Sequence, residues 1–155
     1  MEWSENLLAI ICPRAENDRT EVMPIDICGM APLLEVFDMP TSLAFYRDKL
    51  GFKVTGDSGQ GDESGWVMLE LGGETIMLNT AYDDGSRPDS PDPARVAAHS
   101  DTCIYFGCQD IDAAYEHLKT NGIAGEPPAV APYGMKQLYV RDPDNYNLCF
   151  QWPEK

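Results

Sequence analysis

The sequence is poor in basic residues and in histidine. Its 155 residues include 11 Lys and Arg against 26 Asp and Glu, a formal net charge of −15 at pH 7, and only two histidines. A field of that sign repels nucleic acid and anionic membranes and favours cationic small molecules, although acidity also serves solubility alone. The composition therefore argues against nucleic-acid and membrane partners and leaves a small molecule as the expected ligand.

Long hydrophobic runs and paired cysteines are also missing. The apolar run over 7–12 is too short to span a bilayer, and Glu2 and Glu5 precede it where a signal peptide carries positive charge. None of the five cysteines belongs to a CxxC pair, and without a secretion signal free cysteines are typically reduced thiols. We therefore expect a cytoplasmic protein whose fold depends on an apolar core.

Two segments carry the pattern of an amphipathic helix. Residues 39–50 and 111–121 each follow an Asp that can cap the helix, and each precedes a Gly that can end it. In both segments apolar residues recur at the three- and four-residue spacing of one helical face. The sequence predicts a helix at each place, and each helix needs a sheet to cover its apolar face.

The segments around the two helices repeat one order, β-α-β-β-β. We therefore predict an α+β fold of two tandem βαβββ modules, the product of an internal duplication. Residues 81–101 are rich in Pro, Asp, Ser and Gly, which predicts a mobile linker. The expected organisation is an N-terminal extension over 1–29, a first module over 30–80, that linker, and a second module over 102–155. The predicted strands cover 31–37, 52–56, 66–71 and 75–80, then 103–108, 123–126, 135–141 and 146–152.

Two motifs resemble a known family. The segment AFYRDKLGF at 44–52 resembles the first-helix signature of the vicinal oxygen chelate superfamily, and VRDPDNYNLCFQW at 140–152 resembles its terminal hairpin. That superfamily includes glyoxalase I, extradiol dioxygenases, fosfomycin-resistance transferases and bleomycin-binding proteins. The resemblance covers residues 30–155 and implies the vicinal oxygen chelate fold, in which curved mixed sheets form a cleft for a small molecule. Such a fold does not fix one function.

Alternation along the strands predicts which side chains are buried and which face the cleft. Leu34 and Val36 should pack on the first helix, because successive strand residues point to opposite faces. The predicted core is Leu34, Val36, Leu43, Leu118, Leu138, Val140, Leu148 and Phe150. The predicted ligand-binding residues are Glu35, Phe37, Trp66, Met68, Glu70, Cys103, Tyr105, Tyr139, Arg141, Cys149 and Gln151.

The resemblance also implies positions for a divalent metal ion. Metal-dependent members hold the ion with His, Gln or Glu, and these positions fall on Ala31, Met77, Cys103 and Cys149 here. Alanine and methionine offer a hard ion neither oxygen nor imidazole. We therefore predict no metal and no other cofactor. A soft ion such as Zn²⁺ on Cys103 and Cys149 is the alternative.

Three hypotheses for function follow. The first is a metal-free homodimer that binds a cationic or aromatic small molecule, as the resemblance to bleomycin-resistance proteins implies; aromatic rings beside carboxylates suit flat cations. The second is a lyase, isomerase or dioxygenase of the same superfamily, with Glu35 or Glu70 as the candidate general base, because a carboxylate in an apolar cleft is suited to proton transfer. The third is a passive partner-binding domain that pairs through sheet edges.

Overall fold

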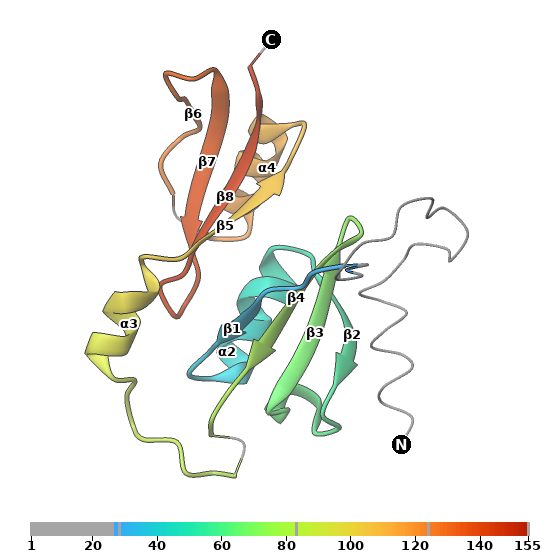
Figure 1. Ribbon diagram of the computed structural model, residues 1–155, viewed down its shortest axis with the longest axis vertical. Helices are drawn as coiled ribbons and strands as arrows, with labels where there is room; N and C mark the ends of the chain where they lie inside the picture. The colour runs from blue at the N-terminus through green and yellow to red at the C-terminus, as the bar shows by residue number, and fades with distance from the viewer. Residues whose placement is uncertain (1–26, 28, 83, 124, 155) are drawn as a thin grey trace.

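The computed structural model describes residues 27, 29–82, 84–123 and 125–154. It contains two four-stranded mixed sheets that follow one another along the long axis of the molecule (Figure 1). A helix lies behind each sheet in this view. We call the sheet face turned away from the helix the open face. Most of the N-terminal extension predicted over 1–29 lies outside the described residues. In the described ranges, no helix is long and apolar enough to cross a membrane.

The first module forms the lower sheet of Figure 1. Strand β1 (Leu33–Glu35) leads into helix α2 (Met39–Leu43), which continues as the π-helical segment η1 (Ala44–Lys49). Strands β2 (Lys53–Asp57), β3 (Trp66–Leu71) and β4 (Glu74–Asn79) follow, with the 3-10 turn η2 (Gly61–Glu63) before β3. The strand order is β1-β4-β3-β2, and β1 pairs with β4 in parallel.

The second module repeats this topology. It consists of β5 (Cys103–Gly107), helix α4 (Ile111–Thr120), β6 (Ala129–Val130), β7 (Met135–Arg141) and β8 (Asn147–Pro153). Its strand order is β5-β8-β7-β6, and β5 pairs with β8 in parallel. The predicted α+β fold of two βαβββ units is therefore confirmed.

The helix ends follow from the residues that flank them. The carboxylates of Asp38 and Asp110 each accept the backbone N–H three residues later, at 3.1 and 2.9 Å. Gly51 and Gly122 stand just beyond the last helical turns with φ of 91° and 72°, a conformation that glycine adopts at little cost. Both predicted helices are confirmed for this reason.

The segment predicted as a mobile linker contains a helix. Helix α3 (Pro93–His99) begins after Asp92, whose carboxylate accepts the Ala94 N–H at 2.9 Å. Asp followed by Pro is a helix-start signal, but seven residues are too few to show a periodic apolar face. The linker expected over 81–101 therefore contains one short helix that the sequence analysis did not predict.

The first strand after α4 is displaced from its predicted position. We expected it over 123–126, and the structure places β6 at Ala129–Val130. The Ile123 N–H instead donates to the Leu118 carbonyl at 2.9 Å, and Ile123 is buried. Ile123 therefore directly follows the C-terminal turn of α4, and its apolar side chain joins the core.

The helix-facing sides of both sheets share one apolar core. Side chains from both modules belong to a single buried cluster. The rings of Phe52 and Phe106 meet edge to face across the junction, with centroids 6.1 Å apart. The predicted core is confirmed, because all eight of its members are buried: Leu34, Val36, Leu43, Leu118, Leu138, Val140, Leu148 and Phe150.

The β7–β8 turn fastens the second module to the first through Asp144. One oxygen of this buried carboxylate accepts the Phe37 N–H at 2.9 Å, and the other accepts the Ser42 hydroxyl at 3.4 Å. These donors lie at the end of β1 and in α2, more than 100 residues away in the chain. Burial raises the pKa of Asp144, and the Phe37 N–H opposes that rise.

Asp142, in the same turn, makes the second polar connection. Its Oδ2 accepts the Tyr46 hydroxyl at 2.9 Å, and its Oδ1 accepts the N–H groups of Asp144 and Tyr146 at 3.0 and 2.8 Å. Burial raises its pKa to about 6, against the opposing effect of these hydrogen bonds. The junction is therefore built on a carboxyl group that titrates close to neutral pH.

Both histidines make contacts between separate elements of the fold. Nδ1 of His99 lies 2.8 Å from the Asp144 carbonyl oxygen, and its ring stacks on Tyr146 with centroids 4.1 Å apart. Nε2 of His117 lies 2.8 Å from the Lys49 carbonyl oxygen, which connects α4 to η1. Both side chains therefore connect elements that lie far apart in the sequence.

The raised pKa of Asp142 predicts a dependence of stability on pH. Because the folded-state pKa of about 6 exceeds the ordinary 3.8, the stabilisation is complete below pH 3.8 and is lost as pH rises through 6. We expect the free energy of unfolding to fall by about 1–3 kcal/mol between pH 5 and pH 7. Urea denaturation at several pH values measures this step.

Asp142→Asn should show only the part of this stability change that is due to Asp144, because asparagine does not titrate. Its neutral amide oxygen can still accept the two backbone N–H groups, so the turn should keep its structure. The matched control is Asp101→Asn, which removes the same charge from an exposed position. Equal steps in the two variants would contradict the assignment to Asp142.

Candidate functional site

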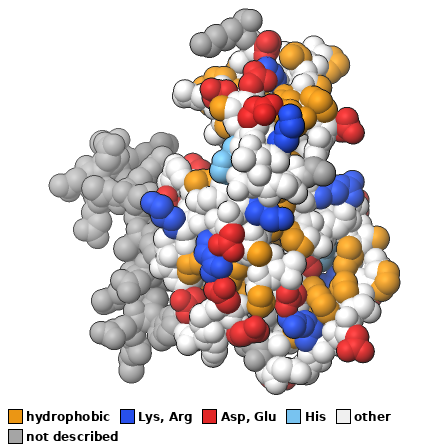
Figure 2. Space-filling view, turned by 180° about the vertical axis from the view of Figure 1, so that it is seen from behind, with side chains coloured by type: hydrophobic (Ala, Val, Ile, Leu, Met, Phe, Trp, Pro, Cys, Tyr) orange, Lys and Arg blue, Asp and Glu red, His pale blue; other side chains and the backbone are white. Residues whose placement is uncertain are grey.

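The helix side of the molecule carries interspersed acidic and basic side chains (Figure 2). Mixed charge of this kind is typical of a solvated surface. The open faces differ, because the strand register gathers chemically distinct residues there in rows that run across the sheet.

The first module places an acid, an amide and an indole in one row. Asn79 of β4 lies opposite both Glu35 of β1 and Trp66 of β3. The Asn79 amide donates to Glu35 Oε1 at 2.9 Å, and the Glu35 side chain is 37% exposed. Neighbouring strands are roughly 4.8 Å apart, so the carboxylate and the indole belong to positions about 10 Å apart. Sequence analysis found Glu35 and Trp66 but not Asn79.

The other predicted residues of this module are placed differently. Met68 is fully buried in the next row, beside Met77. Glu70 lies on the same face as Trp66 but four residues along β3, roughly 13 Å away. Its carboxylate accepts the Gly73 N–H at 3.0 Å in the β3–β4 turn. The structure therefore brings Glu35 and Trp66 into one row and keeps Glu70 at the other end of the face.

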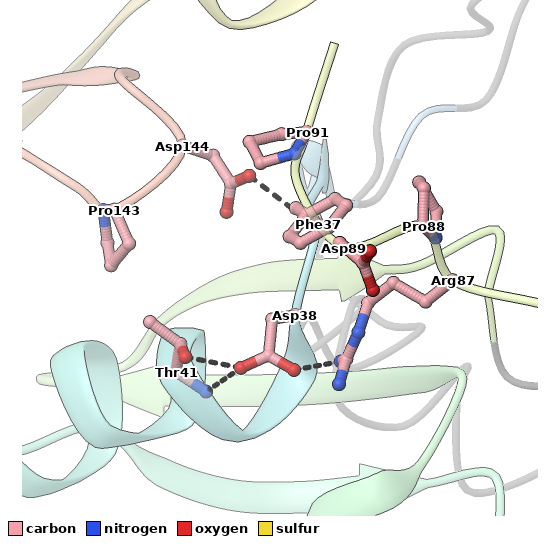
Figure 3. A pocket seen from close by; sticks show the side chains of 9 residues that line it. All are labelled: Phe37, Asp38, Thr41, Arg87, Pro88, Asp89, Pro91, Pro143 and Asp144. Carbon is pink, nitrogen blue, oxygen red and sulfur yellow. Dashed lines mark hydrogen bonds and ion pairs between the residues drawn. The ribbon is translucent and has the colours of Figure 1, made fainter. Parts of the chain in front are cut away.

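Phe37 points toward the linker. Its ring meets that of Tyr82 edge to face at 5.6 Å, and the guanidinium of Arg87 lies 5.8 Å from its centroid. It lines a cavity of about 510 Å³ bounded by the linker, the start of α2 and the β7–β8 turn (Figure 3). Arg87 pairs there with Asp38. Phe37 is the one predicted ligand-binding residue that lines this cavity.

The second module carries an aromatic row. Cys149 of β8 lies opposite both Tyr105 of β5 and Tyr139 of β7. The two hydroxyl oxygens are 3.4 Å apart, and the rings are 54% and 45% exposed, whereas Cys149 is fully buried beneath them. The hydrogen bond with Tyr105 is the main cause that raises the pKa of Tyr139 above its ordinary value. The row offers two polarised aromatic surfaces to a ligand.

An amide row lies beside the aromatic one. Gln137 Nε2 donates to Gln151 Oε1 at 2.9 Å, while Gln137 Oε1 accepts the hydroxyls of Tyr133 and Tyr139 at 3.0 and 3.4 Å. Gln151 was predicted as a site residue. Gln137 and Tyr133 were not, although alternation along β7 places Gln137 on the same face as Tyr139.

The third row of the second module contains the other two predicted residues. Asn147 of β8 lies opposite both Cys103 and Arg141, and Arg141 donates to the Asn145 amide oxygen at 2.6 Å. Cys103 is partly buried, and burial raises the pKa of its thiol. The arginine is therefore engaged with the β7–β8 turn at the edge of the face.

The residues at the metal-ligand positions of the superfamily do not fit a hard divalent ion. The register places Leu33 beside Met77, and Ala31 precedes β1, so none of these three supplies a donor. Burial raises the pKa of the Cys103 and Cys149 thiols, which opposes the thiolate form that Zn²⁺ needs. Among the residues described here, no group of three His, Cys, Asp or Glu side chains is arranged to hold a metal ion.

The two open faces lie on separate sheets, one beyond the other along the molecule (Figure 1). Within one chain, the structure thus groups the predicted residues module by module. The Glu35 row and the Tyr105 row face solvent on different sheets, and each carries a half-exposed side chain suited to contact with a ligand or a second protein surface.

Comparison with known proteins agrees with this architecture. The bleomycin resistance protein of Geobacillus stearothermophilus is 32% identical over 126 residues, which cover 77% of this chain and 92% of that protein. A solved glyoxalase/bleomycin resistance protein/dioxygenase from Nocardioides has a TM-score of 0.63 at 20% identity, covering 88% of both chains. A bleomycin-binding protein complexed with bleomycin has a TM-score of 0.60 at 22% identity, covering 81% of this chain and 98% of that one.

The profile of one family spans both modules. It matches residues 30–150, from the residues before β1 to the middle of β8. Together with the duplicated topology, this match shows that the chain belongs to the Glyoxalase/Bleomycin resistance protein/Dioxygenase superfamily.

Proposed function

We propose that the protein binds a cationic, partly aromatic small molecule on its open faces, without a metal ion. The observation that carries this proposal is the row Glu35, Asn79, Trp66, in which a carboxylate and an indole lie on one face. A cation is attracted by both groups, and an aromatic ring can stack on the indole. The net charge of −15 produces an electric field that also attracts cations.

The relatives support the same class of ligand. One is named a bleomycin resistance protein, and a structural neighbour was solved with bleomycin bound. The exposed rings of Tyr105 and Tyr139 offer further aromatic contact on the second module. Amide and hydroxyl groups of Gln137 and Gln151 beside them supply hydrogen-bond partners. Together these surfaces suit a molecule with cationic, aromatic and polar parts.

We further propose that two chains form a homodimer in which the first open face of one chain covers the second open face of the other. Within one chain these faces lie on successive sheets, and both expose large apolar side chains, namely Leu33 at 46%, Tyr105 at 54% and Tyr139 at 45%. Covering them would remove apolar surface from water and enclose a ligand. Each cleft would then contain Glu35 of one chain and Tyr105 of the other.

Mixing two variants tests this arrangement. Sedimentation should first show a particle of twice the mass of one chain. Chains carrying Glu35→Gln and chains carrying Tyr105→Ala should each bind a cationic aromatic ligand weakly. When an equal mixture of the two is unfolded and refolded, about a quarter of all clefts should bind as in the wild type. The reason is that half of the dimers are mixed, and each mixed dimer has one cleft without a substitution. No recovery, or a monomer, would contradict the shared cleft.

Matched cationic and neutral ligands test the chemistry of the site. Benzamidine carries a charge that benzamide lacks, so benzamidine should bind more tightly in calorimetric titration, and its affinity should fall with salt. Glu35→Gln should weaken benzamidine binding by about 1–2 kcal/mol and leave benzamide unchanged. Glu70→Gln is the matched control, because its carboxylate is engaged at the other end of the face. Equal affinities for the two compounds would refute the cationic preference.

Removal of metal ions separates the binding protein from a metal-dependent enzyme. Since the ligand positions offer no hard donors, EDTA at constant pH should leave the melting temperature and benzamidine affinity unchanged, whereas loss of a bound ion couples to folding. Elemental analysis of the purified protein is the companion measurement. A stoichiometric divalent ion, with a lower melting temperature after chelation, would favour a lyase, isomerase or dioxygenase instead.

A further inference from the structure

The linker carries two arginines, Arg87 and Arg95, and both reach back to the end of β1. Arg95 Nη2 lies 3.6 Å from Glu35 Oε2. Arg87 pairs with Asp38, and its guanidinium lies 5.8 Å from the centroid of the Phe37 ring (Figure 3). The linker thus places its own cations on a carboxylate and an aromatic ring that we predicted from sequence as ligand-binding groups.

Helix α3 holds Arg95 in this position through contacts with the second module. The amide of Asn145 donates to the Val96 carbonyl at 2.9 Å, and that of Asn147 donates to the Ser100 carbonyl at 2.7 Å. His99 in the last turn of α3 stacks on the Tyr146 ring. The helix is therefore attached to the β7–β8 hairpin, while its arginine extends to the first module.

The two oxygens of Glu35 have different partners. Oε1 accepts the Asn79 amide at 2.9 Å, which orients the carboxylate. Oε2 has Arg95 at 3.6 Å, longer than a well-formed hydrogen bond, and the two side chains are 37% and 47% exposed. Ion pairs so exposed are weak because water screens them. A ligand cation that reaches Oε2 can therefore displace Arg95.

We propose that Arg95 is an internal competitor that a cationic ligand must displace from Glu35, so that it sets the affinity of the site for cations. The inference rests on the proposed function and deepens it by naming a class of ligand. A small alkylammonium gains one weak contact in exchange for the lost pair. An amidinium or guanidinium joined to an aromatic ring gains a two-pronged contact with the carboxylate and a stacking contact with Trp66. These extra contacts offset the loss of the Arg95 pair, so we expect aromatic amidines and guanidines to bind more tightly than simple amines.

The test compares benzamidine with methylammonium and benzamide by calorimetric titration at low salt. Arg95→Ala should strengthen the binding of benzamidine by about two- to fivefold, the range expected for an exposed pair, and should leave benzamide unchanged. Methylammonium should gain by about the same factor, because both cations displace the same ion pair, so benzamidine should remain the tighter ligand. Arg95→Gln keeps most of the side chain and should show the same gain.

Two matched variants separate competition from a general change in charge. Lys119→Ala removes the same charge from an exposed position on α4, and Arg87→Ala removes the other linker arginine without touching Glu35. Neither should match the gain of Arg95→Ala. In the Glu35→Gln background, Arg95→Ala should have no effect on benzamidine affinity, since the competed carboxylate is gone.

Each other outcome overturns the inference. If Lys119→Ala strengthens benzamidine binding as much as Arg95→Ala does, the effect comes from the net charge of the protein and not from competition at Glu35. Weaker binding in both Arg95 variants would make the arginine part of the site. If Glu35→Gln weakens binding while the Arg95 variants match the wild type, the inference fails and the proposed function stands. If benzamidine binds neither the wild type nor Arg95→Ala, both fail.

Discussion

The arrangement of the two modules depends on two carboxyl groups in the β7–β8 turn, Asp142 and Asp144. Buried carboxylates destabilise a fold unless hydrogen bonds satisfy them, and here the partners come from both modules. The Phe37 N–H that Asp144 accepts lies two residues beyond Glu35. The same turn therefore joins the modules and fixes the end of the strand that presents the candidate ligand-binding carboxylate.

Sequence predicted the local parts of this fold because their causes are local. The Asp and Gly residues that begin and end α2 and α4 act within one turn. The Gly72-Gly73 pair adopts φ of 63° and 87° in the β3–β4 hairpin, a conformation that glycine favours in tight turns. Alternation along the strands also predicted the core correctly. A shift of one residue along a strand would turn its apolar side chains to the solvent, so the alternation allows only one face to be buried.

The parts that sequence did not predict depend on partners far along the chain. The roles of Asp142 and Asp144 rest on donors 96 to 107 residues away, and no spacing rule connects them. Asn79 was missed because its role follows from register, which places one residue of β4 between two residues of other strands. The contact of Arg95 with Glu35 required α3, whose sequence is too short for a periodic signal. The alternation of residues along a strand predicted which side chains share a face. Only the register between strands shows which of these side chains lie next to one another.

The duplicated topology makes the rows of the two modules comparable. By strand position, Gln151 in the second module corresponds to Asn79 in the first, and Cys149 corresponds to Met77. One copy thus combines a carboxylate and an indole with an apolar row, and the other combines glutamines with a pair of tyrosines. A molecule laid across both faces would meet two unlike surfaces. An elongated ligand with one charged end and one polar, uncharged end would then have a single preferred direction, so the divergence of the two copies would give the proposed cleft a polarity that an exact repeat would lack.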